Sequence, residues 1–168
     1  MTRGEPKESI LRRYLADAVA AEESFEARLN EMSGEGDHLA ARQLFAQHAE
    51  QTQSQRQRLQ GRLEALGGNV SSLKTALAHL VALIPKSAHI GYDDSEITTQ
   101  NLILGYTMAH EKIAMYEALA STATAAGDLQ TEQLAHDIQK EEQHAAEMIW
   151  NFIASSAQQS YGKISEAA

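Results

Sequence analysis

The sequence predicts an all-α protein that folds as a four-helix bundle, and three observations lead to this prediction. Long segments rich in Ala, Gln, Glu and Leu, which favour helices, fill most of the 168 residues. Clusters of Gly, Pro, Ser and Asp interrupt these segments at a few well-defined places. No segment shows the alternating apolar and polar pattern that is typical of a half-buried strand.

The interruptions delimit four long helices and one short one. The breaks are SGEGD, LGGN, IPKSAHIGYDD and AGD. They predict long helices over 8–32, 37–66, 95–125 and 128–155, and a short helix over 71–84. Three residues with a short polar side chain stand at the start of these segments and are expected to act as N-caps: Asp37 and Asp128, which follow glycines, and Ser95.

The lengths of the connections predict the topology. Tight turns join the first helix to the second and the third to the fourth, so each pair is expected to be an antiparallel hairpin. The two hairpins are separated by 28 residues, 67–94, which carry the short helix. Two hairpins joined by one long crossover are typical of ferritin-like folds. We therefore expect a single domain over 1–168, with a core at about 8–155 and a loosely ordered tail at 156–168.

Composition narrows the possible functions. The chain has no cysteine, which excludes a disulfide scaffold, a thiolate metal site and a cysteine nucleophile. Its formal charge of -9 makes nucleic acid and anionic membranes unfavourable partners. The N-terminal segment has no apolar stretch of the kind found in signal peptides, and the run 76–84 is too short to span a bilayer. We expect a cytoplasmic protein. Walker, GxGxxG and GxSxG motifs are absent from the sequence.

Each long helix carries polar residues in the middle of its apolar stripe. A step of about 100° per residue places on these stripes Glu22 in the first helix, His48, Thr52 and Gln55 in the second, Lys112 in the third, and Glu141 and Glu142 in the fourth. A single glutamate in such a position usually lies at the boundary and reaches water. Because all four helices carry polar groups near their midpoints, the sequence indicates a polar centre inside the bundle.

A carboxylate-bridged two-metal site is one interpretation of this centre. Such sites combine one Glu from each of two helices with Glu-x-x-His from each of the other two, because positions i and i+3 share a helix face. Glu141 and His144 have this spacing. One such pair arises readily by chance, His144 lies toward the edge of its stripe, and the second helix has His48 without the matching glutamate.

The chain resembles the YciE/YciF-type ferritin-like proteins of bacteria over most of its length. The resemblance lies in the motifs AEESFEARLNEM, LFAQHAEQTQSQRQRL, IAMYEAL and IQKEEQHAAEMI, one in each long helix, with LGG and AGD at two of the turns. It implies a ferritin-like bundle, often dimeric, that is associated with bacterial stress responses and carries a di-metal carboxylate centre.

Two of the four carboxylate positions that the resemblance implies are not carboxylates in this chain. Glu22 and Glu142 match the family pattern, whereas Gln51 and Lys112 stand where the family has glutamates. An ammonium group at Lys112 could neutralise the remaining carboxylates and form an internal salt bridge. The alternatives are that Lys112 extends outward to water, or that a modified site still binds metal.

Two functions follow from these alternatives. The first is a ferritin-like, stress-associated protein with a degenerate di-metal site and no cofactor. The second is an active di-iron or di-manganese oxidase or peroxide-detoxifying enzyme that uses Glu22, His48, Glu141, Glu142 and His144, because carboxylates and imidazole suit Fe and Mn. A metal-storage cage is disfavoured by the crossover helix and the tail.

The short helix at 71–84 also predicts a homodimer. Its apolar residues cover much of its circumference, which is too wide a stripe for a helix that rests on one face of a bundle: Leu73, Leu77, Leu80, Val81 and Ile84. Two such segments could contribute to a dimer interface.

Overall fold

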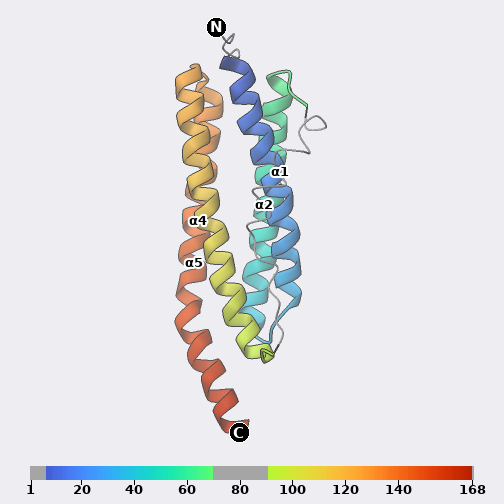
Figure 1. Ribbon diagram of the computed structural model, residues 1–168, viewed down its shortest axis with the longest axis vertical. Coiled ribbons are helices and arrows are strands. Elements are labelled where there is room, and N and C mark those ends of the chain that lie inside the picture. Colours follow the sequence, from blue (N-terminus) through green and yellow to red (C-terminus); the bar gives the residue numbers. More distant parts are fainter. Residues whose placement is uncertain (1–6, 70–90, 168) are drawn as a thin grey trace.

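The part of the chain that the structure describes folds into four long helices (Figure 1). The computed structural model describes residues 7–69 and 91–167, and this part of the chain contains helices and no strand. The helices are α1 (Lys7–Gly34), α2 (Leu39–Ala65), α4 (Asp94–Ala126) and α5 (Leu129–Ala167). The predicted all-α ferritin-like four-helix bundle is confirmed. The predicted short helix at 71–84 lies outside the described residues.

The helices pack as two antiparallel hairpins, as the connection lengths predicted. α1 packs along α2 and α4 packs along α5, while α1 against α4 and α2 against α5 join the two hairpins. Figure 1 shows that α2 ends at one end of the bundle and α4 begins at the other. α2 and α4 therefore point in the same direction.

Turn chemistry fixes where the helices begin. The N-cap of α2 is His38, whose Nδ1 accepts a hydrogen bond from the Ala41 N–H at 3.3 Å. The N-cap of α4 is Asp93, which forms a reciprocal capping box with Glu96. The predictions of Asp37 and Ser95 as N-caps were therefore wrong by one and two residues. Asp128 was predicted correctly: its carboxylate accepts a hydrogen bond from the Thr131 N–H at 3.2 Å.

One glycine in the first turn is required by both conformation and space. Gly36 has φ of 74°, a conformation that residues with a side chain rarely adopt. A Cβ atom at this position would also overlap Oγ1 of Thr98 in α4. The Asp37 N–H donates to the same oxygen at 3.2 Å, so this turn is attached to the start of α4.

The core consists of two apolar layers. One lies toward the end of the bundle where α1 begins and includes Leu11, Leu15, Leu59, Tyr116 and Ile138. The other lies toward the opposite end and includes Phe25, Leu29, Phe45, Met108 and Ile149. Between the two layers, each of three helices has a stretch that belongs to neither layer. These stretches lie near residue 22 in α1, near 52 in α2 and near 142 in α5. The predicted polar centre lies at these stretches.

Helix α5 continues through the segment for which a loosely ordered tail was predicted. Ser156 and Ser160 are buried against α4, and the Ser160 hydroxyl donates to the Ser95 carbonyl at 2.7 Å. Oγ1 of Thr99 lies 2.8 Å from Oγ of Ser156. The prediction of a loose tail over 156–168 was therefore wrong for residues up to Ala167, because small hydroxyl side chains hold this part of the helix to α4.

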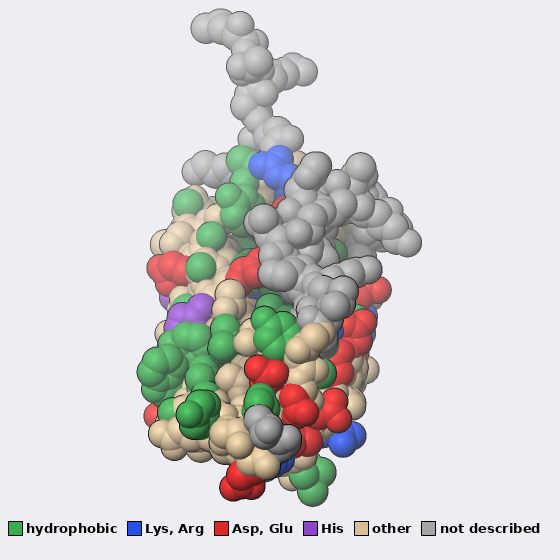
Figure 2. All heavy atoms as spheres, turned by 60° about the horizontal axis from the view of Figure 1, so that its bottom comes forward, with side chains coloured by type: hydrophobic (Ala, Val, Ile, Leu, Met, Phe, Trp, Pro, Cys, Tyr) green, Lys and Arg blue, Asp and Glu red, His purple; other side chains and the backbone are tan. Residues whose placement is uncertain are grey.

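Charge is unevenly distributed over the end of the molecule that faces the viewer in Figure 2. Carboxylates gather on one side of this view, and hydrophobic side chains together with a histidine lie on the other side. Lys and Arg are few in this view, in keeping with the formal charge of -9.

Candidate functional site

All four helices contribute polar side chains to one buried cluster at the centre of the bundle, which we call the ion cluster. None of its members is more than 3% exposed. They are Glu22 from α1, His48, Thr52 and Gln55 from α2, Lys112 and Tyr116 from α4, and Glu142 from α5. The members from one helix are spaced three or four residues apart, at 48, 52 and 55 in α2 and at 112 and 116 in α4. This spacing places each set on one face of its helix.

Lys112 lies at the middle of the ion cluster. Its Nζ atom lies 2.9 Å from Oε2 of Glu22 and 2.8 Å from Oε1 of Glu142. It also donates to Oε1 of Gln55 at 2.7 Å and to Oγ1 of Thr52 at 3.1 Å. The predicted internal salt bridge is confirmed, and the alternative in which Lys112 extends outward to water was wrong.

Glu142 is held in its charged form. Burial alone would raise the pKa of Glu142, but the Lys112 charge and the hydrogen bond from His48 outweigh burial and lower this pKa to about 2. Nε2 of His48 lies 2.9 Å from Oε2 of Glu142, and Nε2 of Gln55 donates to Oε1 at 2.8 Å. The carboxylate therefore has partners on both oxygens.

Glu22 differs from Glu142 in its readiness to bind a proton. Burial raises the pKa of Glu22 above its ordinary value, although Lys112 and the Tyr116 hydroxyl act to lower it. The Tyr116 hydroxyl donates to Oε1 of Glu22. Burial and the adjacent Glu22 raise the pKa of Tyr116 well above 10, so this hydroxyl keeps its proton at neutral pH. Of the two carboxylates beside Lys112, Glu22 is therefore the one that binds a proton more readily as the pH falls.

A chain of hydrogen bonds connects the ion cluster to the surface. Nε2 of Gln55, which donates to Glu142, also lies 2.9 Å from Oε2 of Glu141. Glu141 is 33% exposed and pairs with Arg58 at 2.6 Å. Glu141 is thus at the rim of the cluster, one hydrogen-bonded residue away from Glu142.

The structure brings together three of the five residues that were proposed as metal ligands. Glu22, His48 and Glu142 lie in the ion cluster, Glu141 lies at its rim, and His144 is exposed on the outside of α5. In the part of the chain that the structure describes, no three His, Asp or Glu side chains form a group that could hold a metal ion. Gln51, expected near Lys112, is half-buried at the edge of the stripe.

Sequence reasoning did not assign Tyr116 to the centre. Tyr116 was not among the candidate site residues, and its hydrogen bond to Glu22 was not predicted. The signal was its position four residues after Lys112, on the same face of the helix.

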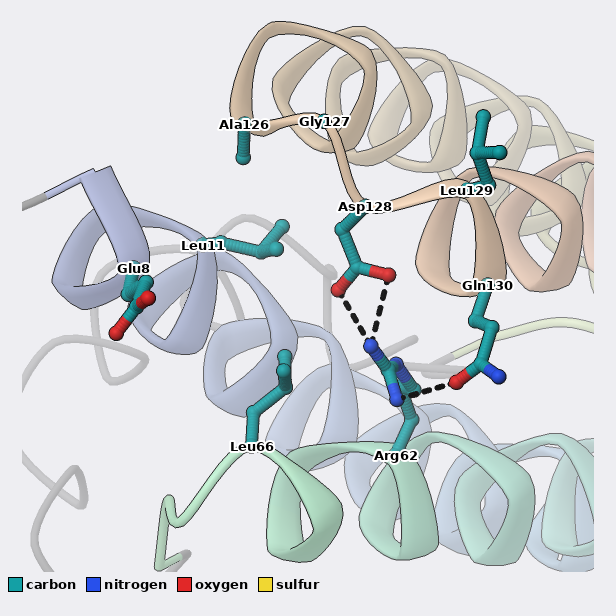
Figure 3. A pocket seen from close by; sticks show the side chains of 9 residues that line it. All are labelled: Glu8, Leu11, Arg62, Leu66, Ala126, Gly127, Asp128, Leu129 and Gln130. Atoms are coloured by element: carbon teal, nitrogen blue, oxygen red, sulfur yellow. Dashed lines mark hydrogen bonds and ion pairs between the residues drawn. The ribbon is translucent and has the colours of Figure 1, made fainter.

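A hollow of about 340 Å³ lies at the end of the bundle where the α4–α5 turn meets α2 (Figure 3). Figure 3 shows the Arg62 guanidinium directed at the Asp128 carboxylate, and the shorter of the two contacts is 2.6 Å. Arg62 also donates to Oγ1 of Thr131 at 2.9 Å and to Oε1 of Gln130 at 2.7 Å. Arg62, Asp128 and Gln130 are engaged with one another in this hollow, and these contacts tie α2 to the start of α5.

Comparisons with known proteins agree with this fold. A family model described as "Domain of unknown function (DUF892)" matches residues 7–161. No curated protein matches the sequence. A protein from Xanthomonas campestris has a similar structure with a TM-score of 0.77 at 24% identity, covering 95% of this chain and 98% of its own.

Two further solved structures are similar at lower identity. The E. coli stress protein YciF has a TM-score of 0.77 at 18% identity, and the match covers 92% of this chain and 99% of YciF. A Dps protein from Bacillus brevis has a TM-score of 0.72 at 13% identity, covering 90% of this chain and 99% of its own. Among the described residues, no helix has the length and apolar character needed to cross a membrane.

Proposed function

We propose that this chain, which belongs to the DUF892 family, is a stress-associated ferritin-like protein with a degenerate di-metal site, and that Lys112 takes the place of the metal charge. The resemblance to the YciE/YciF-type proteins that the sequence predicted is confirmed. The observation that carries the proposal is the position of the Lys112 ammonium, within 2.9 Å of both Glu22 and Glu142.

The chemistry of the donors supports this proposal. A metal ion needs carboxylate oxygens with free lone pairs directed at it, as in the di-metal template. In the ion cluster, Oε1 of Glu142 accepts hydrogen bonds from Lys112 and Gln55, and Oε2 faces His48. A divalent cation would be repelled by the ammonium and would have to displace these donors. The residues present therefore fit an internal cation better than a pair of metal ions.

Elemental analysis tests the proposal directly. The protein is purified without chelators and its iron, manganese and zinc contents are measured per chain. We expect much less than one equivalent of metal. Two equivalents of iron or manganese would overturn the proposal and favour the alternative function, a di-iron or di-manganese oxidase or peroxide-detoxifying enzyme. Oxygen consumption after addition of Fe²⁺ gives a second readout, and we expect no saturable uptake.

The stress association rests on a similarity of fold. One of the similar structures is that of an E. coli stress protein, and at 18% identity this likeness supports a shared fold. We propose a cytoplasmic protein whose abundance rises under stress. Quantification of the protein in its native cells before and after osmotic, oxidative and acid stress tests this, and unchanged abundance under all three conditions would contradict it.

We also propose a homodimer formed through the crossover segment 71–84, and no association with nucleic acid or membranes. The support is the wide apolar pattern of this segment and the formal charge of -9. Light scattering at micromolar concentration is expected to give twice the mass of the chain. A monomeric mass would contradict the dimer.

A further inference from the structure

A groove of about 370 Å³ runs between α1 and α4 on the outside of the bundle. Its lining residues are mostly apolar. They are Tyr14, Asp17 and Ala21 from α1, and Glu111, Ala114, Met115, Ala118 and Leu119 from α4. Three alanines in this set leave the space between the two helices unfilled.

Two carboxyl groups line this otherwise apolar groove, Asp17 on α1 and Glu111 on α4. Oδ1 of Asp17 is buried and has no hydrogen-bond partner. Burial raises the pKa of Asp17 despite the charge of Arg13, and burial also raises the pKa of Glu111. A carboxylate that is partly shielded from water and has an oxygen without a hydrogen-bond partner costs free energy, and a cation bound beside it in the groove would offset part of this cost.

We propose that this groove binds a small organic ammonium ion with a short aliphatic chain. The ammonium group donates hydrogen bonds to Asp17 and Glu111, and the chain lies along Ala114, Ala118 and Leu119. A bare metal ion would leave the apolar wall exposed, and an anionic amphiphile would be repelled by the two carboxylates. The negative charge of the whole chain further raises the local concentration of cations.

The first experiment compares three probes by calorimetry and protein NMR. n-Hexylammonium is expected to bind saturably at one site per chain and to shift the methyl signals of Met115 and Ala118. Hexanoate has the same chain with the opposite charge, and ammonium chloride has the charge without the chain. Both are expected to bind at least about tenfold more weakly. Equal binding of hexanoate, or shifts spread over the whole surface, would overturn the proposal.

Variants locate the site. Asp17→Asn and Glu111→Gln are each expected to weaken n-hexylammonium binding about tenfold, and Ala118→Phe is expected to abolish it by filling the groove. Glu50→Gln is the matched control, because Glu50 is exposed on α2 and the change also removes one negative charge. An equal loss of n-hexylammonium binding in Glu50→Gln would show a general effect of charge and would overturn the proposal.

Two further readouts separate binding from other effects. Circular dichroism and thermal unfolding confirm that each variant is folded, and a folded Ala118→Phe variant that still binds would contradict the proposal. Light scattering tests whether a second copy of the chain fills the groove. A change of oligomeric mass in Ala118→Phe alone would assign the groove to an interface between copies and overturn the ligand site. These outcomes are independent of the metal content of the ion cluster.

Discussion

Lys112 and Glu142 form an ion pair that joins α4 to α5 at the centre of the bundle, with 2.8 Å between Nζ and Oε1 and almost no exposure of either side chain. The attraction between these two buried opposite charges offsets part of the free-energy cost of removing each of them from water. Glu22 adds a second carboxylate on the other side of the same ammonium group. The stability of the bundle centre therefore depends on one lysine.

Replacement of this lysine is expected to be strongly destabilising. Lys112→Met leaves Glu22 and Glu142 close together in the core without a cation, at a cost of roughly 3–5 kcal/mol of unfolding free energy. The carboxyl pKa values then lie above those of the unfolded chain. Stability is therefore greatest at low pH and is lost as the pH rises through the folded pKa. Urea unfolding between pH 5 and 8 measures how much the unfolding free energy of the variant increases as the pH falls.

Lys140→Met serves as the control for this variant, because Lys140 is exposed on α5 and its replacement removes the same charge. We expect its unfolding free energy to stay within about 0.5 kcal/mol of the parent. If Lys112→Met were as stable as the parent across the whole pH range, the internal cation would have no stabilising role.

The hydrogen bond from Tyr116 gives a second, smaller prediction. Tyr116→Phe removes the hydroxyl that donates to Glu22 and is expected to cost about 1.5–3 kcal/mol at neutral pH. The pKa of Glu22 should rise further, so the loss should shrink as the pH falls and Glu22 becomes protonated. Tyr161→Phe is the control, since Tyr161 is 77% exposed. Equal losses at pH 4 and pH 7 would argue against a role for the Glu22 charge.

The place of Lys112 in the core could be predicted because helical periodicity depends only on local sequence. The periodicity put Lys112 in the middle of an apolar arc, the resemblance to known proteins located the carboxylates around it, and the structure decides that its ammonium group points inward. His144 shows the limit of a spacing motif. It has the i+3 spacing from Glu141, yet the helix turns it outward, and the spacing itself carries no information about which face is buried.

The tail could not be predicted because it depends on a distant partner, and two of the three caps could not be predicted because several neighbouring residues are able to act as caps. The segment after residue 155 has few apolar residues, but Ser160 bonds to the carbonyl of Ser95, which is 65 residues away in the chain. The N-cap of α4 is Asp93 and not Ser95, because Asp93 accepts from both the N–H and the hydroxyl of Ser95. Where several neighbouring residues are able to act as the N-cap, the three-dimensional geometry decides which of them does so.

The charged state of Glu142 predicts a dependence on acid pH. Its pKa in the folded chain is about 2, below the ordinary value of 4.5, so its contribution is fully present above 4.5 and is lost as the pH falls toward 2. Glu142→Gln should therefore be less stable than the parent by a few kcal/mol at pH 6, with the difference shrinking below pH 4.5. Unfolding by urea from pH 2.5 to 6 measures it. A difference that grew toward acid would contradict the assignment.

Restoration of carboxylates is expected to create metal binding. The double variant Gln51→Glu with Lys112→Glu removes the ammonium and offers four carboxylates, together with Glu22 and Glu142, to Fe²⁺ or Mn²⁺. Metal should stabilise this variant by about 2.7 kcal/mol when its free concentration is a hundred times Kd. A chelator should reverse the stabilisation. Thermal unfolding with and without Mn²⁺ measures this shift in the variant and in the parent.

The parent and the single variant Gln51→Glu are the controls for this last prediction, because both keep the Lys112 ammonium beside the remaining carboxylates. Neither is expected to gain stability from Mn²⁺, since the ammonium repels a divalent ion and donates to Glu142. Stabilisation of the parent by Mn²⁺ to the same extent as the double variant would show that Lys112 does not prevent metal binding, and the proposal of a degenerate site would fail with it.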